Sequence, residues 1–156
     1  IVVEDGFRGS CQLFATDSIV TGKGCVFNYP SSLGVLRPEN NSNIQPRISV
    51  GSDTEFSGVL VSYEEEQTDM QTLITLGKNS LVKGEVYAGG LVKLDKPVTV
   101  HGKVVWIRFI IQTETSLYEN YLIDVVFNRN KRSAHYLSSG LFLNNKAGNR
   151  IMKWLD

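Results

Sequence analysis

A six-residue repeat of apolar and small side chains runs from Ile74 to Trp106, and it limits the fold more than any other feature of the chain. The repeated unit is a pair of such residues two positions apart, which is the spacing of neighbours on one face of a β-strand. A glycine or a charged residue follows each pair, as at Gly84 and Gly102, where the chain can turn a corner. The pairs are Ile74/Leu76, Ser80/Val82, Val86/Ala88, Val92/Leu94, Val98/Val100 and Val104/Trp106. The pattern therefore predicts short strands separated by bends.

Three such repeat units make one turn of a coil, so that equivalent residues stack from one coil to the next. Val82 and Val100 are separated by three units, and so are Gly84 and Gly102. The predicted fold class is all-β: a short single-stranded parallel β-helix with six-residue walls and about three to five coils. Six-residue walls occur in β-helices of both hands, and the sequence leaves the handedness open.

The same repeat continues on the N-terminal side of this segment. Its pairs there are Leu13/Ala15, Ile19/Thr21, Cys25/Phe27, Ser31/Leu33, Ile48/Val50, Thr54/Phe56 and Leu60/Ser62. Two polar stretches interrupt it, residues 37–47 with two prolines and residues 63–71 with an acidic run. We interpret both as loops inserted at corners, on the outside of the stack. The repeat coils are thus expected over residues 7–106.

The six-residue repeat ends after Trp106. Residues 107–127 carry apolar side chains at alternate positions instead, which is typical of longer strands. An open end of a β-helix exposes backbone donors and core side chains, and this invites pairing with another edge. We therefore expect residues 107–156 to cap or flank the C-terminal end, so that residues 1–156 form a single β-helix domain.

Composition excludes some partners. The chain of 156 residues has 16 basic and 16 acidic side chains, and this balance gives no net attraction to nucleic acid. No run approaches the roughly 18 apolar residues that a membrane-spanning helix needs. The chain begins at Ile1 rather than Met, as a processed or truncated form does, so an extracytoplasmic or membrane-anchored location stays open. Membrane contact is expected only through an N-terminal anchor missing here.

His101 and His135 are the two histidines and the candidates for a general base. His101 is out of phase with the inward pairs, so its side chain is expected to point to solvent near a corner. Acyltransferases with a left-handed β-helix use a histidine at about such a place, and this keeps an acyltransferase-like enzyme as an alternative. A β-helix carbonic anhydrase needs more zinc-binding histidines than this chain has. A surface histidine without a catalytic role is favoured, and we predict no catalytic residue, cofactor or metal ion.

Cys11 and Cys25 are predicted to be free thiols. Cys25 occupies an inward position of the repeat, whereas Cys11 falls at a corner. Their separation along the chain is not a whole number of coils, which argues against a disulfide bond.

Three clusters of polar residues are candidate sites. The first is acidic and could bind Ca²⁺, but it lacks the alternating ligand spacing of a calcium loop, so a solvated loop is favoured. The second is a basic turn and the third a glycosylation sequon, and ordinary surface is the interpretation of both. These clusters are Glu64, Glu65, Glu66 and Asp69; Arg129, Lys131 and Arg132; and Asn40-Asn41-Ser42.

Residues 74–106 resemble the bactofilins, bacterial polymer-forming cytoskeletal proteins with a β-helix core. The resemblance rests on Ile74, Leu76, Gly77, Val82, Gly84, Val86, Gly90, Leu94, Val100 and Gly102. It implies a non-enzymatic structural or assembly protein of the bacterial cell envelope or cytoskeleton. Such a protein would self-associate through an open β-helix end or bind another envelope protein. The loops and the residues after 106 depart from the family, and a cap at one end would block end-to-end polymerisation.

A glycan- or protein-binding module is a further alternative. The stacked walls of a β-helix present flat parallel faces, on which exposed aromatic rings can bind a sugar or a protein. Tyr63, Tyr87 and Trp106 are the candidates, although the repeat places Trp106 inside.

Overall fold

The fold consists of strands stacked in parallel layers. The computed structural model describes residues 1–37, 44–65, 70–112, 116–120 and 122–136. These residues form fourteen strands and one 3₁₀ turn. The prediction of an all-β fold is confirmed.

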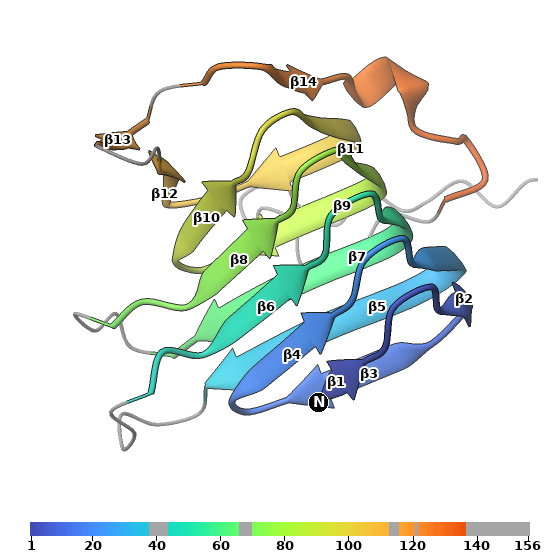
Figure 1. The fold of residues 1–156 in the computed structure, drawn as a ribbon, viewed down its shortest axis with the longest axis horizontal. Helices are drawn as coiled ribbons and strands as arrows, with labels where there is room; N and C mark the ends of the chain where they lie inside the picture. Colours follow the sequence, from blue (N-terminus) through green and yellow to red (C-terminus); the bar gives the residue numbers. More distant parts are fainter. Residues whose placement is uncertain (38–43, 66–69, 113–115, 121, 137–156) are drawn as a thin grey trace, which may run out of the picture.

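The strands form two sheets, which lie one behind the other in Figure 1. Sheet A contains, in spatial order, β1 (Val2–Val3), β4 (Ser18–Thr21), β6 (Arg47–Val50), β8 (Leu73–Leu76), β10 (Leu91–Leu94), β12 (Arg108–Gln112) and β13 (Leu117–Glu119). Sheet B contains β14 (Val125–Phe127), β11 (Val98–Val105), β9 (Ser80–Ala88), β7 (Glu55–Glu64), β5 (Val26–Arg37) and β2 (Arg8–Gly9), and β3 (Gln12–Ala15) also pairs with β5. Of the pairings between these strands only that of β12 with β13 is antiparallel. The chain thus passes from sheet A to sheet B and back, adding one layer each time.

The register of the layers follows the spacing of the sequence repeat. Val92 lies beside Ile74 in sheet A, and Val100 lies beside Val82 in sheet B, so both pairs are separated by three repeat units. Ile74 also lies beside Ile48, and this step along the chain is longer because of the insertion between β7 and β8. Both steps agree with the prediction from the repeat.

The core lies between the two sheets and is built from columns of like side chains. One column contains Ile19, Ile48, Ile74, Val92 and Phe109. All the predicted inward residues from Ile19 to Val100 are buried, none more than 3% exposed. The pairs at the ends of the repeat, Leu13/Ala15 and Val104/Trp106, are partly buried against this core. The predicted inward positions are confirmed.

The described layers form two sheets, with short strands in sheet A and longer strands in sheet B. Pairing between the long strands of sheet B continues through a bend in each of β7, β9 and β11. Gly58, Gly84 and Gly102 occupy this stacked bend, which we call the corner of sheet B, with φ of 145°, 143° and 157°. A Cβ on Gly84 would lie 2.0 Å from the carbonyl oxygen of Gly58, so the layers stack closely only because both are glycine.

Parallel pairing extends beyond the residues of the six-residue repeat at both ends. Strand β1 pairs with β4 before residue 7, and β12 pairs with β10 after Trp106. Strand β14 adds a further layer to sheet B by pairing with β11. The alternating residues after 106 therefore begin with strands of the same stack, and residues 137–156 of the predicted cap lie outside the described part.

The two predicted loops fall between strands, one between β5 and β6 and the other between β7 and β8. The loop boundaries are shifted, because Arg37 still belongs to β5, Arg47 to β6 and Glu64 to β7. The central residues of both loops, and with them the sequon Asn40-Asn41-Ser42, are outside the described residues.

Candidate functional site

The outer face of sheet B is crossed by the chain after strand β14, and we name residues 128–136 the strap. It begins where the backbone N–H of Asn128 donates to the carbonyl of Val100 in β11, at 2.8 Å. The 3₁₀ turn η1 (Arg129–Lys131) follows, and Asn128 caps it by accepting from the N–H of Asn130 at 3.1 Å. A short amide side chain suits this place, because it reaches the free N–H groups of the first turn. Figure 1 shows the strap leaving β14 and descending beside the strands of sheet B.

An ion pair is the first contact that anchors the strap. Arg132 Nη1 lies 2.8 Å from Glu85 Oε1. Glu85 stands in β9 between Gly84 and the inward-facing Val86, so its side chain projects from the outer face of the sheet. It is nevertheless only 2% exposed. A carboxylate at an outward position is buried in this way only under a covering segment, and the guanidinium supplies the counter-charge that such a group needs.

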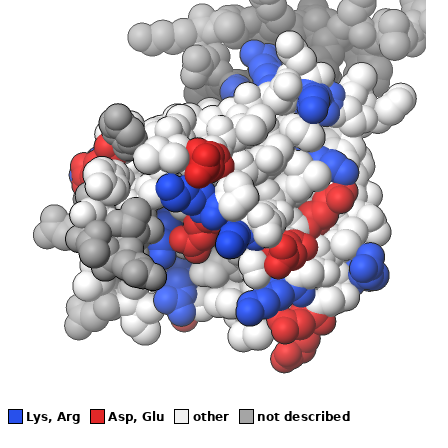
Figure 2. Space-filling view, turned by 45° about the horizontal axis from the view of Figure 1, so that its top comes forward, with Lys and Arg blue, Asp and Glu red and all other residues white. Residues whose placement is uncertain are grey.

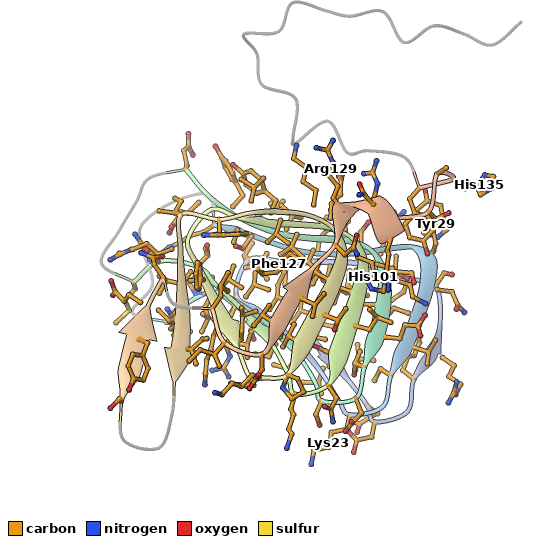
Figure 3. All side chains as sticks on the ribbon, turned by 90° about the horizontal axis from the view of Figure 1, so that it is seen from above. Lys23, Tyr29, His101, Phe127, Arg129 and His135 are labelled. Carbon is orange, nitrogen blue, oxygen red and sulfur yellow. The ribbon has the colours of Figure 1, made fainter. Side chains whose placement is uncertain are left out.

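A pair of tyrosine rings is the second anchor. The ring of Tyr136 stacks on that of Tyr29 in β5, with centroids 4.3 Å apart and an angle of 9° between the planes. Strand β7 lies between β9 and β5, so the two anchors are on different layers of the sheet. Figure 3 shows Tyr29 and His135 close together at one end of the molecule, away from the labelled Phe127 of β14. The strap therefore spans from the last layer of sheet B to one of its first.

His101 is in the middle of β11 on the outer face, and it is half-buried. It lines a shallow hollow of ≈ 330 Å³ together with residues of the neighbouring corner, Asn79, Ser80, Leu81, Pro97 and Thr99. Partial burial lowers the pKa of His101 below its ordinary value of 6.5, and the nearby charges of Lys131 and Lys83 lower it further. The imidazole is therefore neutral near pH 7 and able to accept a proton. The predicted outward position is confirmed.

The charged groups around the strap come from three strands and from the strap itself. Lys83 is the register partner of His101 and forms an ion pair with Glu55 of β7. Lys103 is the register partner of Glu85. Figure 2, which views another side of the molecule, likewise shows basic and acidic side chains interleaved rather than separated by sign. Such mixed faces give no large field of one sign, in agreement with the balanced composition.

The basic turn was predicted to be ordinary surface, and this is wrong for one of its members. Arg129 and Lys131 are exposed, but Arg132 is partly buried in the ion pair with Glu85. The other histidine, His135, is exposed on the strap.

Sequence reasoning missed Glu85, Tyr29 and Tyr136, since each has the appearance of an ordinary surface residue within or after a strand. An outward charge or ring carries no periodic signal that would show what covers it.

The acidic cluster is also only partly as predicted. Glu64 is not in a solvated loop but at the end of β7, where it is buried beside its register partner Arg37. Burial raises the pKa of Glu64, and the backbone of Thr72 and the guanidinium of Arg37 act against this rise. Glu66 and Asp69 lie outside the described residues. Within the described ranges, no three or more His, Cys, Asp or Glu side chains are grouped so that they could hold a metal ion.

Both cysteines are free, as predicted. Cys25 is fully buried in the core between the sheets, which confirms its inward position. Cys11 is half-buried, and this burial raises the pKa of its thiol, which makes the thiol less reactive.

The aromatic candidates divide into exposed and packed residues. Tyr63 is exposed and Tyr87 half-buried on the outer side of sheet B. Trp106 packs edge-on against Phe109 and is stacked with Phe127, at centroid distances of 5.4 and 5.6 Å. The predicted inward position of Trp106 therefore agrees with its packing at the end of the core.

Comparisons with protein-family models, with curated proteins and with solved structures found no match. In the part of the chain that the structure describes, no helix has the length and apolar character needed to cross a membrane.

Proposed function

We propose that the chain is a non-enzymatic structural or assembly protein of the bacterial cell envelope or cytoskeleton, comparable to the bactofilins. The observation that carries the proposal is the pair of sheet edges at each end of the described stack. Sheet A ends with β1 and β13, and sheet B ends with β2 and β14. Strands at a sheet edge have backbone N–H and C=O groups free to pair with another chain. Two such ends on one molecule are what a head-to-tail assembly requires.

The exposed apolar residues support the same interpretation. Val2 in β1 is 73% exposed and Val126 in β14 is 52% exposed, so each end combines an edge strand with an uncovered apolar side chain. The sequence argued against end-to-end polymerisation, because it assigned a cap to the C-terminal end. Since β14 leaves an edge of sheet B at that end, we now expect growth from both ends.

A β-helix with six-residue walls is part of the proposal. In this interpretation sheet A is the first wall, and the two halves of each long strand of sheet B are the second and third. The stacked corner at Gly58, Gly84 and Gly102 supports it, because a wall boundary recurs there in successive layers. A stack of this kind can be extended by adding further layers without changing its cross-section.

The test of assembly places one charge at each edge. Light scattering and electron microscopy should find concentration-dependent oligomers of the full chain. Val2→Lys and Val126→Lys should each give monomers, because every head-to-tail contact uses one edge of each kind and a lysine on an edge strand opposes pairing. A mixture of the two variants should form dimers and nothing larger, and the chain with both substitutions should be monomeric. Thr99→Lys, on the neighbouring non-edge strand β11, is the matched control and should leave assembly unchanged. A full chain that stays monomeric at every concentration would refute the proposal.

A binding module is the second candidate, and an apolar patch at the N-terminal end favours it. Phe14 and Leu36 line a shallow hollow of ≈ 440 Å³, and Tyr63 is the register partner of Leu36 on the next strand. All three side chains are exposed. Aromatic rings placed in this way can stack on sugar rings. Titration with bacterial cell-wall glycan fragments should then shift the NMR signals of these rings, and Phe14→Ala with Tyr63→Ala should remove binding. Unchanged signals would exclude this candidate.

The acyltransferase alternative depends on His101. Its neutral imidazole beside a hollow is compatible with a general base. Acyl-coenzyme A analogues should leave the melting temperature of a purely structural protein unchanged. A shift that His101→Ala abolishes would favour the enzyme instead.

A further inference from the structure

The strap contacts the outer face of sheet B through two anchors, an ion pair and a ring stack. These anchors determine which kind of segment this face can bind. Glu85 supplies a carboxylate on β9, and Tyr29 supplies a ring on β5. Arg132 and Tyr136 of the strap are four residues apart and meet these two groups. The outer face of sheet B thus recognises a short segment with an arginine followed, four positions later, by an aromatic residue.

The strap packs on the outside of the stack, so its release leaves the core between the sheets intact. None of the residues of η1 is buried, and the strap adds no side chain to the hydrophobic core between the sheets. Release would also leave no buried charge behind. Glu85 is covered by the strap itself, so its carboxylate and the guanidinium of Arg132 would both return to water. The large penalty for an unpaired buried ion applies only when the remaining partner stays buried.

We propose that this face of sheet B is a docking surface for the strap of a second copy of the chain. The proposal rests on the proposed function, since it names one contact through which copies in an assembly would be joined. Each copy carries both the strap and the surface, so a twofold exchange reproduces every anchor without any new kind of contact. Within one chain the strap is present at an effective concentration of the order of millimolar, so exchange between copies requires them to be held close together.

Charge reversal gives a direct test, made with the full chain carrying Val2→Lys and Val126→Lys so that edge pairing is suppressed. Glu85→Arg and Arg132→Glu each place like charges at the anchor and should be monomeric alone. Mixed together, each surface meets a complementary strap, and sedimentation should detect heterodimers on the order of tenfold above either variant alone. The chain with both substitutions restores the pair internally and serves as the folded control. A mixture that sediments as two monomers, while this control is folded, would overturn the proposal.

Cross-linking of the tyrosine anchor provides a second measurement that leaves Glu85 unchanged. Tyr29→Cys and Tyr136→Cys are made in separate full-length chains that also carry Cys11→Ser, because Cys11 is the less buried native thiol. With strap exchange, a short bis-maleimide should join the two variants when they are mixed at high concentration. The chain with both cysteines should be cross-linked internally and shows that the reagent spans the site. Internal but no intermolecular product would exclude exchange.

The two proposals fail in different ways. If the unmodified chain assembles but the charge-reversal mixture does not form heterodimers, the assembly proposal is supported and strap exchange is refuted. If the unmodified chain is monomeric and the mixture forms heterodimers, the docking surface is supported and edge-based assembly is refuted.

Discussion

The stack and the strap are stabilised by different means. In the stack, five or more successive layers place apolar residues above one another, as in the column of Phe27, Phe56, Val82, Val100 and Phe127. The contacts described for the strap lie instead on the outer face, and they include an ion pair, a ring stack and the hydrogen bond from Asn128 to Val100. Burial of apolar surface is worth about 25 cal/mol per Å² and accumulates over every layer of the stack. The contacts of the strap, in contrast, can be lost by local release of residues 128–136 while the layers stay packed. Substitutions in the two regions should therefore differ widely in effect.

The largest expected effect follows from placing a charge in the stack. Val82→Asp or Val100→Asp leaves an unpaired carboxylate at a position that is 0% exposed. This costs several kcal/mol, against a total stability of about 5–15 kcal/mol, so the domain should unfold. Circular dichroism melting measures it. Thr99→Asp, one position earlier and facing outward, is the control and should keep its cooperative transition. A Val100→Asp chain with an unchanged melting temperature would show that this side chain is not inside.

A methyl group at the stacked corner should have the next largest effect. In Gly84→Ala the new Cβ would meet the carbonyl oxygen of Gly58 at 2.0 Å, and φ of 143° is itself unfavourable for alanine. The Cβ is fixed directly to Cα and the carbonyl oxygen belongs to the backbone, so neither atom can rotate away. The layers must therefore separate, and we expect a loss of about 3 kcal/mol or more.

Gly24 offers the matched control for that substitution. Its φ is 63°, but nothing lies within 4 Å of an added Cβ. Gly24→Ala should therefore cost only the conformational strain, about 1–2 kcal/mol. Chemical denaturation of both variants compares the two costs. Equal losses would mean that strain, and not the contact between layers, decides the corner.

The stack could be predicted from sequence because its signal is local and repeated. Burial of residues two apart defines a strand face, and a constant spacing then fixes the register, as for Val92 beside Ile74. The length of the strands in sheet B was not predicted, because glycines at corners do not reveal whether hydrogen bonding continues through them. Glu64 was misassigned because a run of acidic residues was interpreted as loop, although β7 extends into it.

The strap could not be predicted because its contacts join distant residues on outward positions. Arg132 and Glu85 are 47 residues apart. No periodic pattern connects them, and their charges are what any solvated surface carries. Pairing between two such residues becomes visible only when the layers are in place and the path of the chain after β14 is known.

A smaller effect is expected from removing the guanidinium of the strap. Arg132→Ala should expose residues 128–136 to amide hydrogen exchange while it changes the stability of the stack by about 1 kcal/mol or less. The strap should respond alone because it contributes no side chain to the core. Arg129→Ala is the control, since Arg129 is exposed on the same turn, and its exchange should match that of the unmodified chain. Loss of the whole stack in Arg132→Ala would show that the strap is part of the cooperative core.

The smallest expected effect is a dependence of strap docking on pH. Partial burial, Lys131 and Lys83 hold the pKa of His101 below 6.5 when the strap is docked. Release removes Lys131 and part of the burial, so the pKa rises and the released form binds the proton more readily.

Because the released form binds the proton more readily than the docked form, acid conditions oppose docking of the strap. Docking is fully favoured above the pKa of the released form and weakens as the pH falls through the lower pKa of the docked form. Amide exchange of the strap, corrected for its intrinsic pH dependence, should therefore rise between about pH 7.5 and about pH 5.5. His101→Gln should remove the rise. His135→Gln should retain it, because His135 is exposed on the strap and does not line the hollow that contains His101. If the rise persists in His101→Gln, the histidine does not control the strap under acid conditions, and the charges around His101 have no part in docking.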